Sequence, residues 1–183
     1  KMDFRLRYSW LASGDNSGLI CLSGAHLGSI GQHLLSGRPE QAKQAALTLS
    51  ELFPNRFYLE LQRLPEKPEW ENAVVGSLNL AQELDLPIVA THPAQFLNKD
   101  DFQAHEARVC IASGYVLADT RRPKNFYPSQ YFVPADEFEA RFADVPEALQ
   151  NSVAIAKRCN VEIVLGENFL PQFPTPDGMT LDD

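Results

Sequence analysis

The sequence predicts an α/β fold in which parallel strands alternate with flanking helices. Short apolar runs bounded by Gly, Pro or charged residues recur along the chain of 183 residues, as is typical of strands buried on both faces. Longer segments between these runs repeat apolar residues at helical spacing. Strands that alternate with helices of this length indicate βαβ units, and therefore a parallel sheet or barrel.

Four short runs are the predicted strands, and each is shorter than an ordinary helix. They are Gly18–Ser23, Arg56–Gln62, Pro87–Ala90 and Val161–Leu165. The third run is apolar throughout, which predicts burial on both faces of the sheet.

Two helices are predicted between the first three strands. The helix that follows Pro39 has an apolar face made by Ala42, Ala45, Ala46, Leu49, Leu52 and Phe53. The next opens at Pro68 and runs to about Leu84, with an inward face made by Trp70, Ala73, Val74, Leu78, Ala81 and Leu84.

Two further helices and a long loop are predicted after the third strand. Asp100 or Asp101 can cap a helix that carries Phe102, His105 and Val109. The last helix begins at Pro146 and ends near Cys159. Between these helices, the stretch from 114 to 131 is rich in Arg, Pro and Tyr and is expected to be a long ordered loop.

Composition indicates a folded protein with an acidic surface. The hydrophobic fraction is 44%, the formal net charge is −8 and the pI is near 5. Such a surface repels a phosphate backbone on average, so we expect no sequence-independent DNA binding by this chain alone. No charged-then-apolar leader and no apolar run of about 20 residues is present, so the sequence predicts a cytoplasmic protein with no membrane partner.

Cys21, Cys110 and Cys159 lie far apart and follow no C-x-x-C spacing. An odd number of cysteines without a pattern is typical of a reducing compartment, and we expect these three to be buried free thiols.

Four sequence blocks carry a family resemblance. They read A-H-E-A-R-V-C-I-A-S-G-Y at 104–115, D-T-R-R-P-K-N at 119–125, P-E-A-L-Q-N-S-V-A-I-A-K-R-C-N-V at 146–161 and L-P-Q-F-P at 170–174. In this order and spacing they resemble the C-terminal portion of the PHP (polymerase and histidinol phosphatase) domain of the bacterial DNA polymerase III alpha subunit, proteobacterial type. The resemblance extends back through the first two predicted strands.

The resemblance implies an irregular β/α barrel. The opening strands of that barrel, with their His-rich metal motif, are not among the residues of this chain, so we expect a partial PHP-type barrel. On this reading residues 1–170 are a PHP domain fragment, and residues 171–183 are an exit linker toward a polymerase palm domain outside the chain.

The resemblance also implies where metal ligands would lie in active PHP domains. Ala25 stands where active relatives place a Cys ligand, and Pro93 and Gln95 stand in place of an Asp and a His. Alanine and proline side chains offer no donor atom, and an amide is a poor ligand for a soft divalent ion. We therefore expect no metal and no catalytic residue in this chain.

His26 and His92 are the candidates for a displaced ligand, because each neighbours one of the substituted positions. Adjacent side chains of a strand point to opposite faces, so a structural or surface role is favoured over a ligand role.

Basic residues form one dense cluster. Arg121, Arg122 and Lys124 lie among the aromatics Phe126, Tyr127, Tyr131 and Phe132. Interleaved basic and aromatic residues can grip single-stranded nucleic acid or a phosphate. Two alternatives are a loop whose aromatics plug the core while its cations stay solvated, and a contact with a carboxylate-rich partner. Arg108 joins this set of possible phosphate or partner contacts, although Glu106 and Arg108 are expected to pair and anchor a loop.

The resemblance implies that the parent protein is a DNA-directed DNA polymerase, with Mg²⁺ held by palm residues outside this chain and DNA contacted by the parent. It implies that this segment is a metal-free scaffold for the proofreading exonuclease subunit. One alternative is an active metal-dependent phosphoesterase or exonuclease, which would need His26, His92 and the absent His-rich motif. Another is a free-standing β/α domain with a ligand of its own.

Overall fold

The computed structural model describes residues 8–167 and places three parallel strands at their centre. The strands are β1 (Cys21–Leu22), β2 (Phe57–Leu61) and β3 (Ile88–Ala90), in the spatial order β1-β2-β3. Cys21 pairs with Phe57, and Leu59 pairs with Ile88. The predicted α/β fold with parallel strands and flanking helices is confirmed, as an open arrangement consistent with a partial barrel.

The central strand β2 forms the middle of the core. Leu59 and Leu61 are fully buried, and the β3 residues Ile88, Val89 and Ala90 are at most 6% exposed. Burial of β2 and β3 on both faces is the reason that their sequences are almost continuously apolar.

The four predicted helices are present. They are α3 (Pro39–Leu52), α4 (Glu71–Leu84), α5 (Phe102–Ser113) and α7 (Pro146–Arg158). The 3₁₀ turns η2 (Pro68–Trp70) and η3 (Lys99–Asp101) lead into α4 and α5. All six apolar residues predicted on the α3 face lie in the core or pack against it, which confirms that face.

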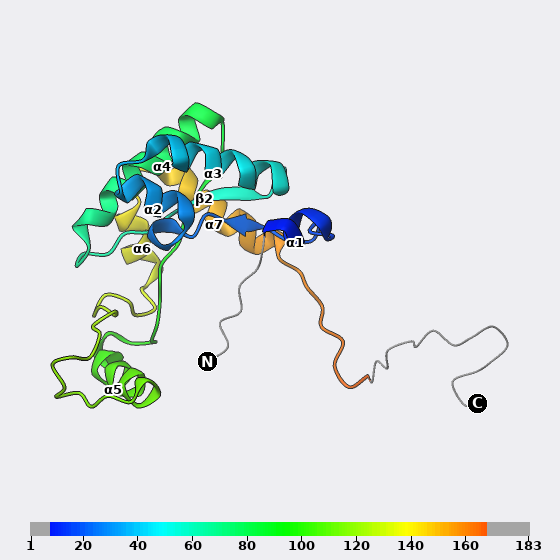
Figure 1. Cartoon of the computed structure of the whole chain (residues 1–183). Coiled ribbons are helices and arrows are strands. Elements are labelled where there is room, and N and C mark those ends of the chain that lie inside the picture. Colours follow the sequence, from blue (N-terminus) through cyan, green and yellow to red (C-terminus); the bar gives the residue numbers. More distant parts are fainter. Residues whose placement is uncertain (1–7, 168–183) are drawn as a thin grey trace, which may run out of the picture.

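Three short helices add to these four. They are α1 (Tyr8–Ser13), α2 (Ser29–Leu35) and α6 (Ala135–Arg141), of six or seven residues each. Two turns are too few to show a helical period. Figure 1 shows α2, α3 and α4 gathered beside the sheet, while α5 and the loop after it form a lobe set apart from them.

The helix α7 packs against the outer edge of β3. The Asn151 side chain donates to the carbonyl of Ile88 at 2.8 Å, and the Ser152 hydroxyl donates to the carbonyl of Ala90. These side chains satisfy carbonyl groups that face away from β2. A helix therefore covers the edge at which a further strand would have to pair.

The predicted strand Val161–Leu165 is wrong for this structure. These residues follow α7 without regular structure, and Val161 and Leu165 are each 84% exposed. One physical reason is that Asn151 and Ser152 already occupy acceptors on the open side of β3. The predicted linker 171–183 lies outside the described residues, so the predicted domain boundary stays a prediction.

The prediction of buried thiols holds only in part. Cys110 is buried and Cys21 is half-buried, but Cys159 is exposed because it follows the last turn of α7. No helix within residues 8–167 is both long and apolar enough to cross a bilayer.

Candidate functional site

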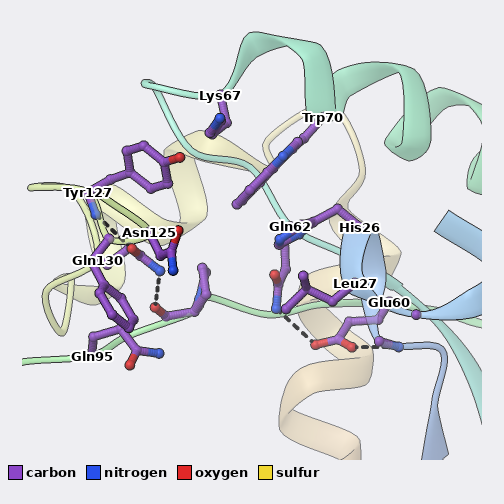
Figure 2. A pocket seen from close by; sticks show the side chains of 14 residues that line it. His26, Leu27, Glu60, Gln62, Lys67, Trp70, Gln95, Asn125, Tyr127 and Gln130 are labelled. Atoms are coloured by element: carbon purple, nitrogen blue, oxygen red, sulfur yellow. Dashed lines mark hydrogen bonds between the residues drawn. The ribbon is translucent and has the colours of Figure 1, made fainter. Parts of the chain in front are cut away.

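A pocket of about 860 Å³ opens at the carboxyl ends of the three strands. Gly24 follows β1, Gln62 follows β2 and Pro93 follows β3, so all three strands deliver residues to it. Ligands of open α/β sheets bind outside this end of the strands. Figure 2 shows the side chains that line the pocket, which belong to His26, Leu27, Glu60, Gln62, Lys67, Trp70, Pro93, Gln95, Asn125, Phe126, Tyr127 and Gln130.

The wall next to β1 is a tight 3₁₀ turn, η1 (Ala25–Leu27). Gly24 and Ala25 both have positive φ, of 80° and 43°, so the chain reverses sharply after the strand. A Cβ on Gly28 would lie 1.8 Å from the carbonyl oxygen of Ser23, so this turn can close only with glycine there. His26 therefore lies on a turn. The expectation that His26 and Ala25 point to opposite faces of a strand was wrong, because neither residue is in a strand.

His26 packs against Trp70 of η2. The two rings are stacked, with centroids 3.4 Å apart and planes 15° apart. Burial, followed by the nearby Lys67 ammonium, lowers the pKa of His26 and favours the neutral ring. Nδ1 of His26 is buried and has no hydrogen-bond partner among residues 8–167.

Glu60 contributes the single carboxylate among the described residues that line the pocket. The Gly24 N–H donates to Oε2 at 3.1 Å, while the Gln62 amide at 3.2 Å and the Thr91 hydroxyl donate to Oε1. Both carboxylate oxygens are therefore engaged by protein donors. Sequence reasoning missed Glu60, and the signal that could have found it is one charged residue near the carboxyl end of an apolar strand.

The structure brings the three substituted ligand positions to one region. Pro93 and Gln95 line the pocket, and Ala25 lines a cavity of about 10 Å³ that shares His26, Glu60 and other walls with it. Within residues 8–167, no three His, Cys, Asp or Glu side chains gather as a metal site would require. Loss of the metal stays a prediction that the donor chemistry of these positions favours.

His92 lies apart from His26, in the wall of a second, apolar pocket of about 370 Å³ beside Phe132 and Phe138. Its Nε2 lies 2.9 Å from the carbonyl oxygen of Tyr131, and its Nδ1 lies 3.3 Å from Nη1 of Arg141. Arginine can only donate, so Nδ1 accepts and Nε2 carries the hydrogen. His92 also follows the end of β3, so strand alternation does not apply to it either.

Residues of the predicted basic cluster differ in their partners and in their exposure. Arg122 forms an ion pair with Glu106 of α5, and the two side chains are only 13% and 8% exposed. Arg121 pairs with Asp119 at 2.8 Å and is 83% exposed, and Lys124 is also exposed. The proposed Glu106–Arg108 pair was wrong, because Arg122 takes Glu106.

Arg108 and the aromatics of the loop complete this region. The Arg108 guanidinium lies 3.2 Å from Nδ1 of His105, and the Phe126 ring meets the His105 ring edge-on at 4.6 Å. Phe126 thus packs the loop against α5. Phe132, by contrast, is 71% exposed. Contact of Arg108, Arg121, Arg122 or Lys124 with a phosphate or a partner stays a prediction.

Comparison with known proteins gives one consistent family. Residues 2–64 match the family described as PHP domain. A DNA polymerase III subunit alpha of Neisseria meningitidis serogroup A is 63% identical over 178 residues, which are 97% of this chain and 16% of that protein. The proteins of the same name from Pseudomonas fluorescens and Escherichia coli K12 are 46% identical over 95% and 91% of this chain, and 15% and 14% of their own length. The chain thus spans about a sixth of the relatives it matches.

Proposed function

Because this chain belongs to the DNA polymerase III alpha-subunit family, as a segment of its PHP domain, we propose that it is part of a replicative DNA polymerase. The parent protein would extend a primer along a template, with Mg²⁺ held by acidic residues that lie outside this chain. The acidic surface of the segment, with a net charge of −8, supports a role other than holding the DNA backbone.

Within that polymerase, we propose that the segment is a metal-free scaffold that docks the proofreading exonuclease subunit. The observation that carries this proposal is the wall of the strand-end pocket. It presents Pro93 and Gln95 where active relatives would present metal ligands, and Ala25 lies in the adjoining cavity. A site without its ligands has no reason to keep the metal, so the domain is free to serve as a docking platform.

The hydrogen bonds of the pocket support the metal-free state. Glu60, the one acid in the wall, has protein donors on both oxygens. His26 is stacked on Trp70, and both ring nitrogens of His92 face protein groups outside the pocket. An active metal-dependent phosphoesterase or exonuclease would have to break the contacts of Glu60 and His92 before either could bind an ion, whereas stacking leaves Nδ1 of His26 without a partner among residues 8–167.

Two titrations test the proposal. Calorimetry with Mn²⁺ and Zn²⁺, on this chain and on a longer form that includes the preceding part of the domain, should give no heat of binding. Tight, stoichiometric binding to the longer form would overturn the metal-free state and favour the phosphoesterase alternative.

Docking is tested separately, with the exonuclease subunit of the same polymerase titrated into the longer form. We expect saturable binding that is unchanged when a chelator is present. Absence of binding would overturn the scaffold role and leave the metal result unaffected.

A further inference from the structure

The pocket at the carboxyl ends of the strands has features that neither a metal site nor a partner-docking surface would need. Its two charged side chains are already paired, since Glu60 accepts three hydrogen bonds and the Lys67 ammonium lies 3.1 Å from Glu69. The Lys67 ammonium also lies 5.0 Å from the centre of the Tyr127 ring. With His26 neutral, the pocket carries no net charge with which to select an ion.

Three side-chain amides supply free hydrogen-bonding groups to the pocket, in addition to the unpartnered Nδ1 of His26. The amides of Gln95 and Asn125 are exposed and make no hydrogen bond to any residue from 8 to 167. The Gln62 amide nitrogen donates to Glu60 and Thr91, which leaves its carbonyl oxygen as an acceptor. Gln130 is different, because it is held by the backbone of Pro93 at 3.1 Å and of Tyr127 at 2.8 Å.

These free groups lie on opposite sides of the cavity. Figure 2 shows Gln95 and Asn125 on one side and Gln62 and Leu27 on the other, with the Trp70 ring reaching in between them. Each free amide offers both a donor and an acceptor in one plane. A ligand that pairs with both sides must carry hydrogen-bonding groups on two of its edges.

Apolar and aromatic surfaces complete the wall. Leu27 is 78% exposed, and Pro93, Phe126 and Trp70 also line the cavity. The Trp70 ring is held by His26 on one face and has the Tyr127 ring at a right angle, 6.5 Å away. The volume of about 860 Å³ lies within the range that holds small organic ligands.

From these features we infer that the pocket binds a nucleobase, with its edges paired to the amides of Gln95 and Asn125 and to the Gln62 carbonyl. Nucleobases are flat, uncharged and bear hydrogen-bonding groups on more than one edge, which matches the walls. The base can belong to a free nucleoside or nucleotide, or to the end of a single strand. This inference is independent of whether the segment docks an exonuclease.

Nuclear magnetic resonance on this chain, with uncharged nucleosides as the probe, tests the inference. Adenosine and cytidine should shift the Trp70 indole and the Gln95 and Asn125 amide signals saturably, with dissociation constants on the order of 0.1 to 1 mM. Replacing Gln95→Ala and Asn125→Ala together should weaken binding at least about fivefold, the equivalent of one hydrogen bond. Both side chains are exposed and unpaired, so the fold should survive the change.

Gln103→Ala is the matched control, because Gln103 is an exposed amide on α5 that does not line the pocket. A short oligonucleotide and its abasic counterpart separate the two sources of the base. Binding of nucleosides assigns the site to free ligands, and binding of the intact oligonucleotide alone assigns it to a strand end. The inference is overturned if neither binds, if the abasic strand binds equally well, or if the double variant binds as well as Gln103→Ala.

Discussion

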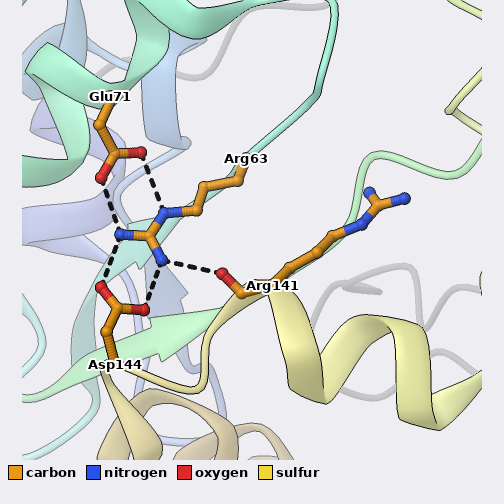
Figure 3. Close-up of polar contacts among 4 residues, drawn as sticks. All are labelled: Arg63, Glu71, Arg141 and Asp144. Atoms are coloured by element: carbon orange, nitrogen blue, oxygen red, sulfur yellow. Dashed lines mark hydrogen bonds and ion pairs between the residues drawn. The ribbon is translucent and has the colours of Figure 1, made fainter.

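Arg63 and Asp144 form a two-pronged ion pair, with Nη1–Oδ1 and Nη2–Oδ2 distances of 2.6 Å and 3.0 Å. The same guanidinium reaches Glu71 through Nε at 3.0 Å and Nη2 at 2.7 Å, and donates to the carbonyl of Arg141 at 2.8 Å (Figure 3). It also lies 5.2 Å from the centre of the buried Phe142 ring. One side chain thereby joins the end of β2 to the start of α4 and to the turn before α7.

We predict that Arg63→Lys lowers the free energy of unfolding by about 2 kcal/mol, because an ammonium cannot reproduce the planar fork. The carboxylates of Glu71 and Asp144 are 45% and 59% exposed, so water compensates part of the loss. Urea unfolding measures the change. Lys43→Ala is the control, since its pair with Glu83 is exposed and its loss should cost less than about 0.5 kcal/mol. Equal effects of the two substitutions would contradict the prediction.

Glu106 and Arg122 form the most buried ion pair of the loop region, and Oε1 of Glu106 has no partner among residues 8–167. Arg122→Ala would leave that carboxylate buried and unpaired, so we predict a loss of about 3 kcal/mol. Adding Glu106→Ala should restore part of the stability, because the orphaned charge is removed.

Arg121→Ala is the matched control for this pair, since its side chain is 83% exposed and its loss should change stability by less than about 0.5 kcal/mol. Urea unfolding of the unmodified chain, the single variants Arg122→Ala and Glu106→Ala, and their double variant gives the coupling energy. A double variant as unstable as the sum of the two single variants would show that the pair is not coupled.

The pH dependence of folding stability should reflect the protonation of His92. Burial first, and then the Arg141 guanidinium, lower the pKa of His92, while Glu137 and the backbone acceptors of Tyr131 and Ser129 act in the opposite direction. The unfolded chain, with a histidine pKa of about 6.5, therefore binds the proton more readily than the folded chain. The stability that the folded chain gains from a neutral His92 is fully present above about pH 6.5. It is lost as the pH falls toward the pKa of His92 in the folded chain.

We expect the urea midpoint of the chain to fall between about pH 7 and pH 5.5, before most carboxylates titrate. Burial also lowers the pKa of His26 and His105, so they share in this fall. His92→Gln should reduce the slope without abolishing it. An unchanged slope would mean that His92 gains no proton on unfolding in this range.

Exposed apolar residues after α7 predict self-association. Val161, Ile163, Val164 and Leu165 are between 61% and 84% exposed and form one run of strand-forming residues. Such a run can add to a sheet edge or collect into an apolar contact between copies. Light scattering during size exclusion should therefore show concentration-dependent dimers or larger species.

The double substitution Ile163→Lys and Leu165→Lys should shift the population toward monomer, because charges on the run oppose strand addition. Val153→Lys is the control, since Val153 is an exposed apolar residue on α7 outside the run. A clean monomer of the unmodified chain at all concentrations would contradict this prediction.

Prediction from the sequence succeeded where the signal was local. The α3 helix was predicted because its apolar residues repeat at helical spacing, and β2 because its run is apolar and short. The prediction of a strand at Val161–Leu165 was wrong although the residue pattern is typical of a strand. The strand would have to pair with the edge of β3, and α7 covers that edge. Sequence pattern gives the propensity of a strand, whereas a neighbouring backbone decides whether it forms.

The candidate site was predicted only in outline. Family resemblance marked Ala25, Pro93 and Gln95, and the structure places them in one region. Glu60 with its three donors, and the stacking of His26 on Trp70, could not be predicted from spacing. These contacts join residues up to 44 positions apart in the chain, and no local pattern encodes them.

The sequence by itself determined the fold class, the apolar faces of the long helices and the family, since each depends on residue order along a short stretch. Only the tertiary structure decided which polar groups have a hydrogen-bond or ion-pair partner and which have none in the described part of the chain. Arg122 is used by Glu106 and Glu60 by its three donors, while the amides of Gln95 and Asn125 remain available. The physical reason is that hydrogen bonds and ion pairs are satisfied in three dimensions, by whichever partner the packing of distant segments brings within reach.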